Sequence, residues 1–203
     1  MKKLIFLQEN ILKKIFNNFH YIFFILIFFN FNEANTKEKW SIDNSISYVE
    51  FEVPVLLATN VKGKFTDING FVELDFINNK ENKAIFAVKI NSLELNYEKY
   101  LELIFSNLFF EIDKFPLAII DTKNFKYTNE SEINLNAELI IKNKSEYIPI
   151  RITINKFTEN LVQVIGKFEF SRTIFNIGTN QWRNTSILKD SISVKSNIFL
   201  YKE

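Results

Sequence analysis

From about residue 40 to the C-terminus, apolar and polar residues alternate with a period of two. This pattern constrains the fold more than any other feature of the chain. The clearest run is Ile148–Asn155, in which isoleucine occupies every second position. Comparable runs cover residues 49–53, 72–76, 86–90, 133–141, 162–170 and 192–200. Strict alternation gives a strand one dry face and one solvated face, as in antiparallel sheets. About eight such strands joined by short turns predict a barrel or a sandwich.

One stretch departs from this alternation. Leu101, Ile104, Phe105 and Leu108 follow the i, i+3, i+4, i+7 spacing of an apolar helix face. We therefore expect one short helix around residues 97–109. Inserted between strands, such a helix would cover a barrel mouth or an open sheet edge.

The first 39 residues have a different character from the rest. Lysines at positions 2, 3, 13 and 14 precede an uninterrupted apolar run of nine residues, Tyr21–Phe29. This is the layout of a secretory signal peptide, and the run is well short of the roughly 20 residues that span a membrane. The region after it offers only Ala34 as a small residue for cleavage, so an uncleaved N-terminal membrane anchor stays open. We divide the chain into an export segment or anchor, residues 1–39, and a folded domain, residues 40–203.

The composition excludes several classes of protein. The chain has no cysteine, and its single histidine, His20, belongs to the export segment. Disulfides, thiolate metal sites, zinc sites and Ser-His-Asp triads are therefore implausible in the folded domain. An enzyme would need an Asp/Glu pair or a Ser-Lys dyad, and no spacing supports either. The formal net charge of +1 argues against a nucleic-acid binder that relies on bulk basicity. We predict a non-enzymatic protein with no catalytic residue, cofactor, metal or nucleic-acid partner.

Several motifs of the folded domain together resemble the YceI-like family. The resemblance covers residues 40–201, and the motifs occur in the family's order and spacing. One departure is Ile46, which stands before Ser47 where the family's opening pair has a histidine. The motifs are Trp40–Val53, Val61–Phe65, Asn69–Asp75, Ser106–Pro116 and Ser171–Gly178, followed by Trp182 and Lys189–Ile192.

The resemblance implies an all-β fold, a lipocalin-like extended antiparallel β-barrel with eight strands. It also implies an exported protein that holds a long apolar molecule, polyisoprenoid or fatty-acid-like, inside the barrel. On this basis we expect a carrier or sequesterer of lipid without catalysis, with a homodimer left open. We expect it in the periplasm or secreted, and tethered to a membrane if the export segment is not cleaved.

Apolar side chains on the dry phase of the strands, with the predicted helix and C-terminal loop, are the candidate wall of the lipid site. An apolar chain needs no polar anchor there, because each buried methylene group contributes about 0.8 kcal/mol. The candidates are Val49, Phe51, Val53, Phe65, Val72, Leu74, Phe76, Phe86, Val88, Leu101, Phe105, Phe109, Ile120, Leu139, Ile152, Phe168, Phe170, Phe175 and Trp182.

Two questions stay open at this point. The same side chains could fill the barrel themselves, as in a structural or stress-linked envelope protein without a lipid ligand. A continuous void of roughly 300 Å³ or more would distinguish the two cases. Arg172 shares the phase of Phe168 and Phe170. Either it points inward to a ligand head group or to an internal carboxylate (Asp43, Asp75 or Glu111), or a bulge at Ser171 turns it outward.

Overall fold

The computed structural model describes residues 37–75 and 81–203. The chain divides into two compact units, Met1–Thr36 and Lys37–Glu203, and only the second is described below. The predicted export segment lies outside the described residues except for its last three positions. Phe76, one of the candidate wall residues, also lies outside them.

The described unit is built almost entirely from antiparallel strands. No helix in residues 37–75 or 81–203 is long and apolar enough to cross a membrane. The strands are β1 (Glu38–Ile42), β2 (Tyr48–Val53), β3 (Val61–Phe65), β4 (Ile68–Leu74), β5 (Asn82–Lys89), β6 (Leu93–Leu95), β7 (Leu117–Phe125), β8 (Glu132–Ile141), β9 (Lys144–Thr158), β10 (Leu161–Ser171) and β11 (Ser191–Lys202).

Eight strands form a closed ring, which confirms the predicted barrel. The hydrogen-bonded order runs β1-β4-β5-β7-β8-β9-β10-β11, and β11 pairs again with β1. The remaining strands, β2, β3 and β6, continue the sheet beside the first half of β11. Strands β1 and β2 are therefore the two halves of one long bent strand. The same holds for β3 with β4 and for β5 with β6. Counted in this way, the barrel is an eight-stranded meander.

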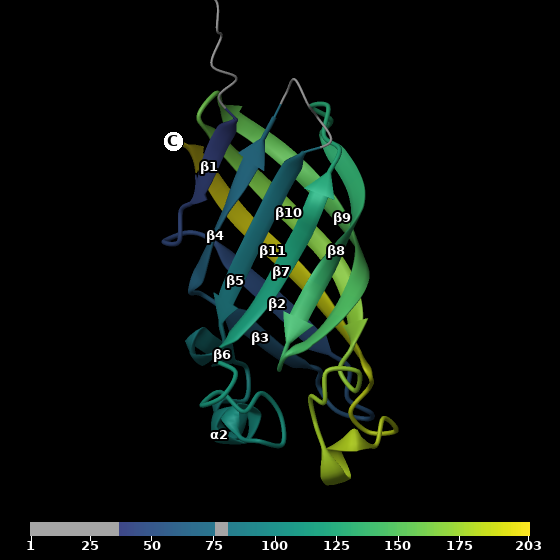
Figure 1. The fold of residues 1–203 in the computed structure, drawn as a ribbon. Helices are drawn as coiled ribbons and strands as arrows, with labels where there is room; N and C mark the ends of the chain where they lie inside the picture. Colours follow the sequence, from purple (N-terminus) through teal and green to yellow (C-terminus); the bar gives the residue numbers. More distant parts are fainter. Residues whose placement is uncertain (1–36, 76–80) are drawn as a thin grey trace, which may run out of the picture. The chain divides into compact units, whose positions relative to one another are not determined.

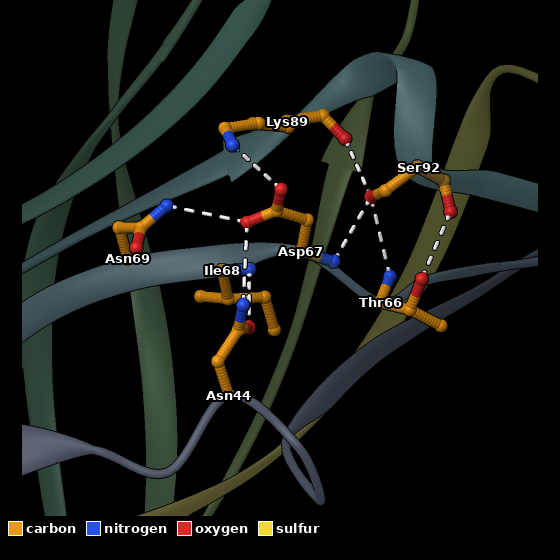
Figure 2. A network of polar contacts seen from close by, with 7 residues as sticks. All are labelled: Asn44, Thr66, Asp67, Ile68, Asn69, Lys89 and Ser92. Carbon is orange, nitrogen blue, oxygen red and sulfur yellow. Dashed lines mark hydrogen bonds and ion pairs between the residues drawn. The ribbon is translucent and has the colours of Figure 1, made fainter.

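A serine hydroxyl joins two of these bends. Ser92 lies in the short helix η1 (Ile90–Ser92) that separates β5 from β6. Its Oγ accepts hydrogen bonds from the backbone N–H groups of Thr66 (3.2 Å) and Asp67 (3.1 Å), between β3 and β4, and donates to the carbonyl of Lys89 (2.7 Å). Lys89 also forms an ion pair with Asp67 at 2.6 Å. Figure 2 shows these contacts converging from neighbouring strands.

The third bend, between β1 and β2, joins the same network. The side-chain oxygen of Asn44 accepts a hydrogen bond from the N–H of Ile68 (2.8 Å), and its side-chain nitrogen contacts Asp67 at 3.4 Å. Buried backbone donors must find partners, and side chains supply them where the ladder is interrupted. The network therefore allows three long strands to bend together without leaving N–H groups unpaired.

The predicted helix is shorter than residues 97–109. It consists of a 3-10 turn, η2 (Glu98–Tyr100), followed by one turn of α-helix, α2 (Leu101–Phe105). Ser106 ends the helix because its backbone turns extended, with ψ at 171°, and its hydroxyl donates to the carbonyl of Leu103. A serine that bonds back to the preceding turn competes with helix continuation. Leu108 therefore lies beyond the helix.

The two ends of the barrel differ. We call the end that carries segments 54–60, 96–116 and 172–190 the loop end; the last of these contains the short helix η3 (Asn180–Arg183). In Figure 1, α2 and the segment between β10 and β11 lie at this end, and the C-terminus lies at the other. The turn between β9 and β10 lies at the opposite end, because Leu161 pairs with Tyr201 near the end of β11.

Side chains of the dry phase form the core. In β11, Ile192, Val194, Ile198 and Leu200 are buried, and most of the residues that alternate with them are exposed, although Asn197 is buried. At the opposite end a cluster centred on Trp40 closes the lumen. At the loop end a larger cluster extends from the barrel walls to side chains of segments 96–116 and 172–190, including Phe109 and Phe175. The opposite end is thus closed by packed side chains, and the site lies between that cluster and the loop end.

Candidate functional site

An apolar cavity of about 450 Å³ occupies the lumen. This volume is within the range of about 300–1,000 Å³ that small-molecule sites occupy. Strands β2, β3, β5, β6, β7, β8, β9, β10 and β11 all contribute side chains to its wall, together with Ile68 at the start of β4. Because successive residues of a strand point to opposite faces, the dry phase of each strand meets the others across the lumen.

The structure places most of the candidate residues on this wall. Val72 and Leu74 instead pack in the cluster around Trp40 at the opposite end. Leu101, Phe105 and Phe175 pack in the core of the loop end without reaching the cavity wall. Those on the wall are Val49, Phe51, Val53, Phe65, Phe86, Val88, Phe109, Ile120, Leu139, Ile152, Phe168, Phe170 and Trp182, with Arg172.

Sequence reasoning missed two groups of wall residues. The first has the same alternating phase as the candidates, and examples are Ile150, Val164, Val194 and Ile198. The period-two pattern could have found them. The second group lies at the loop end and carries no pattern, because loops have no fixed side-chain period. It comprises Val55, Ala58, Thr59, Tyr97, Lys99, Tyr100, Leu103, Ile104, Phe110, Ile177, Ile187 and Leu188.

A glycine shapes one side of the cavity. A Cβ atom built on Gly63 would lie 2.3 Å from Cε1 of Phe51 and 2.8 Å from a methyl carbon of Leu93. The Phe51 ring therefore lies directly across the backbone of β3 and contacts Phe65, with ring centroids 5.6 Å apart. Any larger residue at position 63 would push this ring toward the lumen. The glycine of the Val61–Phe65 motif thus keeps space open inside the barrel.

Arg172 is the one charged side chain buried deep in the loop end. It is 1% exposed, and its guanidinium donates only to backbone carbonyl oxygens. Nε bonds Lys189 (2.9 Å), Nη1 bonds Ile177 (3.0 Å) and Nη2 bonds Leu188 (2.8 Å). Two longer contacts, Nη1 to Gly178 (3.5 Å) and Nη2 to Asn184 (3.4 Å), complete the set. An arginine has five N–H donors, and here each has an acceptor.

These contacts decide whether Arg172 points inward or is turned outward by a bulge at Ser171. The side chain points inward, and no carboxylate of the described residues lies within ion-pair distance of it. Burial lowers the pKa of the guanidinium, and the charge of Asp190 partly opposes this shift. Because every donor is occupied, the guanidinium has none left for a ligand head group. Its role is to hold segment 172–190 over the end of the barrel.

Asp190 belongs to the same segment and is held by hydrogen bonds. Burial disfavours its charged form, but donation from the Ser171 hydroxyl (2.7 Å) and the Thr173 N–H (3.1 Å) outweighs burial, so its pKa lies below the ordinary value. The carboxylate is therefore charged at neutral pH and fixes the start of the segment. The hydrogen bonds of Asp190 thus join the end of segment 172–190 to its beginning.

Free polar groups are scarce on the cavity wall. Ser196 and Thr122 face it, but Ser196 Oγ accepts from the N–H of Gly166 (3.0 Å), and Thr122 Oγ1 accepts from Ala84 (2.9 Å). Within the described ranges, only the indole Nε1 atoms of Trp40 and Trp182 are buried without a hydrogen-bond partner. Of these two, Trp182 lines the cavity, with its ring 5.7 Å from that of Phe109. Trp182 therefore brings a buried N–H without a partner to the set of residues that line the cavity.

The described residues contain no group of three or more His, Cys, Asp or Glu side chains that could hold a metal ion. The cavity instead offers an apolar lumen in which the apolar surface of a ligand would be removed from water. Such burial stabilises a complex by roughly 25 cal/mol for each Å² of apolar surface. The site is therefore suited to binding an apolar molecule.

Comparison with known proteins agrees with this architecture. A family model described as "YceI-like domain" matches residues 40–200. No curated protein matches the sequence. Among solved structures, BcnA of Burkholderia cenocepacia is similar with a TM-score of 0.70 and 21% identity, over 78% of this chain and 98% of BcnA.

Two further structures have the same fold. A polyisoprenoid binding domain from Saccharophagus degradans, implicated in plant cell wall breakdown, has a TM-score of 0.66 and 13% identity, over 81% of this chain and 98% of that domain. The Campylobacter jejuni YCEI protein has a TM-score of 0.59 and 19% identity, over 74% of this chain and 89% of its own. At these identities the likeness concerns the fold.

Proposed function

The chain belongs to the YceI-like domain family, and from that premise we propose that its barrel binds the long apolar chain of a lipid. The observation that carries the proposal is the apolar cavity of about 450 Å³ in the lumen. The Saccharophagus degradans neighbour, a polyisoprenoid binding domain of the same fold, supports an isoprenoid as one ligand class. The protein acts as a carrier or sequesterer and performs no chemistry on the lipid.

The energetics are sufficient without a polar anchor. A chain that buries about ten methylene groups at about 0.8 kcal/mol each gains roughly 8 kcal/mol, which corresponds to about micromolar affinity. The volume also exceeds the roughly 300 Å³ expected of a ligand cavity, and this counts against a barrel filled by its own side chains. Export to the periplasm or beyond the cell, by way of residues 1–39, is part of the proposal.

Mass spectrometry tests the proposal directly. The full chain is purified from two unrelated expression hosts and extracted with organic solvent, and the intact protein is weighed beside the extract. We expect a long-chain apolar compound at near-stoichiometric amount, and an intact mass that reports whether the export segment has been removed. Empty protein from both hosts, together with no uptake of a fluorescent fatty acid, would refute lipid binding.

The unpaired indole of Trp182 yields a separate prediction. If its N–H bonds a ligand oxygen, Trp182→Phe removes one hydrogen bond worth about 1 kcal/mol, so the Kd for hexadecanol rises about fivefold. Hexadecane, which has no oxygen, is the matched ligand, and its affinity should be unchanged. Titration with tritiated ligands measures both. An equal loss for the two ligands would mean that the indole contributes packing alone.

A further inference from the structure

The most exposed apolar side chains of the loop end lie on two adjoining loops. Leu57 is 98% exposed, Leu56 50% and Ile187 61%. The loops are joined by backbone hydrogen bonds from Leu56 N–H to the Ile187 carbonyl (2.8 Å) and from Lys189 N–H to the Pro54 carbonyl (3.0 Å). We call these three side chains the apolar tip.

The same two loops form part of the cavity wall. Val55 and Ala58 line the cavity from the first loop, and Leu188 lines it from the second. Ile187 contributes to the wall and to the apolar tip at once. Tyr100, which is 41% exposed, lines the cavity from the neighbouring segment. The exposed apolar surface is therefore continuous with the cavity.

Leu57 is held outward at a conformational cost. Its φ is 57°, in the left-handed region that non-glycine residues rarely adopt. Such a conformation persists only when the surrounding structure imposes it, and it is often found at functional positions. The side chain packs against nothing in the described fold, so it adds no stability to the barrel. Burial of its apolar surface outside this fold, in a bilayer or against another protein, would therefore be favourable.

We propose that the apolar tip inserts into the interfacial region of a lipid bilayer, so that a lipid chain passes between the bilayer and the cavity without crossing water. This rests on the proposed function. The loops of the tip carry net positive charge, because residues 54–60 have no charged side chain and segment 172–190 has Arg172, Arg183 and Lys189 against the single acid Asp190. Lys99 beside the ring of Tyr100, 5.1 Å from its centroid, adds the basic and aromatic pair that favours an anionic interface.

The size of the apolar tip favours a bilayer over a second copy of the chain. A stable dimer buries about 800 Å² on each partner. A few exposed side chains supply an apolar patch of only a few hundred Å². A projecting leucine pair is too small for such an interface, whereas it is sufficient for shallow insertion below lipid head groups.

A site-specific label tests the proposal on the full chain. Because the protein has no cysteine, Leu57→Cys gives a single attachment point for an environment-sensitive fluorophore. With vesicles of phosphatidylcholine and phosphatidylglycerol we expect a blue shift, a rise in intensity and quenching by spin-labelled lipid. The control, Glu159→Cys, places the label in the turn between β9 and β10 at the opposite end and should not respond. Attachment of the chain to vesicles by any other segment would not produce the signal at position 57.

A transfer assay links insertion to lipid exchange. Leu57→Asn suits the left-handed backbone, since asparagine tolerates positive φ, so the fold is not at risk. Combined with Leu56→Ser, which like position 57 lies outside the cavity wall, it should slow transfer of a fluorescent fatty acid between vesicles by about tenfold or more. Binding of the same fatty acid without vesicles should be unchanged. The control, Phe157→Asn, removes a 56% exposed phenylalanine near the opposite end and should leave the transfer rate unchanged.

The outcomes separate the two proposals. A silent label at position 57, with the fatty acid still bound in the cavity, overturns insertion and leaves lipid binding standing. A fluorescence change that follows protein concentration without vesicles overturns insertion in favour of a second copy. If the fatty acid does not bind at all, the proposed function fails, and the label still decides whether the tip enters the bilayer.

Discussion

Ala118→Trp is expected to abolish lipid binding while leaving the barrel folded. Ala118 lies near the start of β7, pairs with Val88 and lines the cavity with the smallest side chain on that strand. An indole in its place would occupy the room of about five methylene groups, and at about 0.8 kcal/mol each their loss weakens binding by about 10²- to 10³-fold. Uptake of a fluorescent fatty acid measures the loss, and thermal unfolding should show a Tm equal to or above that of the unaltered protein.

The matched control for this variant is Ala87→Trp. Ala87 occupies the adjacent strand β5 one position before Val88, so its side chain points to the outer face. The same substitution there leaves the lumen untouched, and binding should be unaffected. If Ala118→Trp binds the fatty acid as tightly as the unaltered protein does, the ligand does not occupy the lumen and the proposed function is wrong.

Arg172→Met is expected to destabilise the protein more than any other single change considered above. The replacement has a similar length but no donor, so the carbonyl oxygens of Ile177, Leu188 and Lys189 lose their partner inside the loop end. A buried polar group left unpaired costs about 1–3 kcal/mol, and several together should cost at least about 3 kcal/mol. For a chain of this size the Tm should fall by about 6 °C or more. Calorimetry or thermal circular dichroism measures it.

Two further variants distinguish hydrogen bonding from charge. Arg172→Lys keeps the positive charge but provides three donors in place of five, so its Tm should lie between those of Arg172→Met and the unaltered protein. Arg151→Met removes an exposed arginine of β9 and should change the Tm little. If Arg172→Lys were as stable as the unaltered protein, charge would matter more than the fork of donors, and our account of this residue would be incorrect.

How far the candidate site could be predicted depended on where each residue lies. On strands, the alternation correctly placed Phe51, Phe168 and Phe170 toward the lumen, because the pleat alone decides which face a side chain takes. It could not tell that Val72 packs against Trp40 while Val88 lines a void. That difference depends on which side chains arrive from distant strands and how completely they fill the cross-section.

Arg172 illustrates a second limit. The phase of β10 pointed its side chain inward, and the structure agrees, but the partners we considered were carboxylates. The actual partners are main-chain carbonyls between residues 177 and 189, and main-chain groups carry no signature in a sequence. The helix shows a related limit, since its apolar spacing continued to Leu108 while the side chain of Ser106 ended it earlier.

By itself, the alternation in the sequence determined the strands and their inward faces, because it is a local property that each strand carries independently, and it left a barrel or a sandwich open. The resemblance to the YceI-like family added the closed eight-stranded barrel. Only the tertiary structure decided that the lumen keeps a cavity, that Arg172 holds segment 172–190 in place, and that Leu56, Leu57 and Ile187 lie on adjoining loops. These features come from the summed volumes of side chains drawn from all around the barrel, and from loops whose positions depend on contacts far away in the chain. The period-two alternation contains no information about how completely the side chains fill the lumen or about where the loops lie.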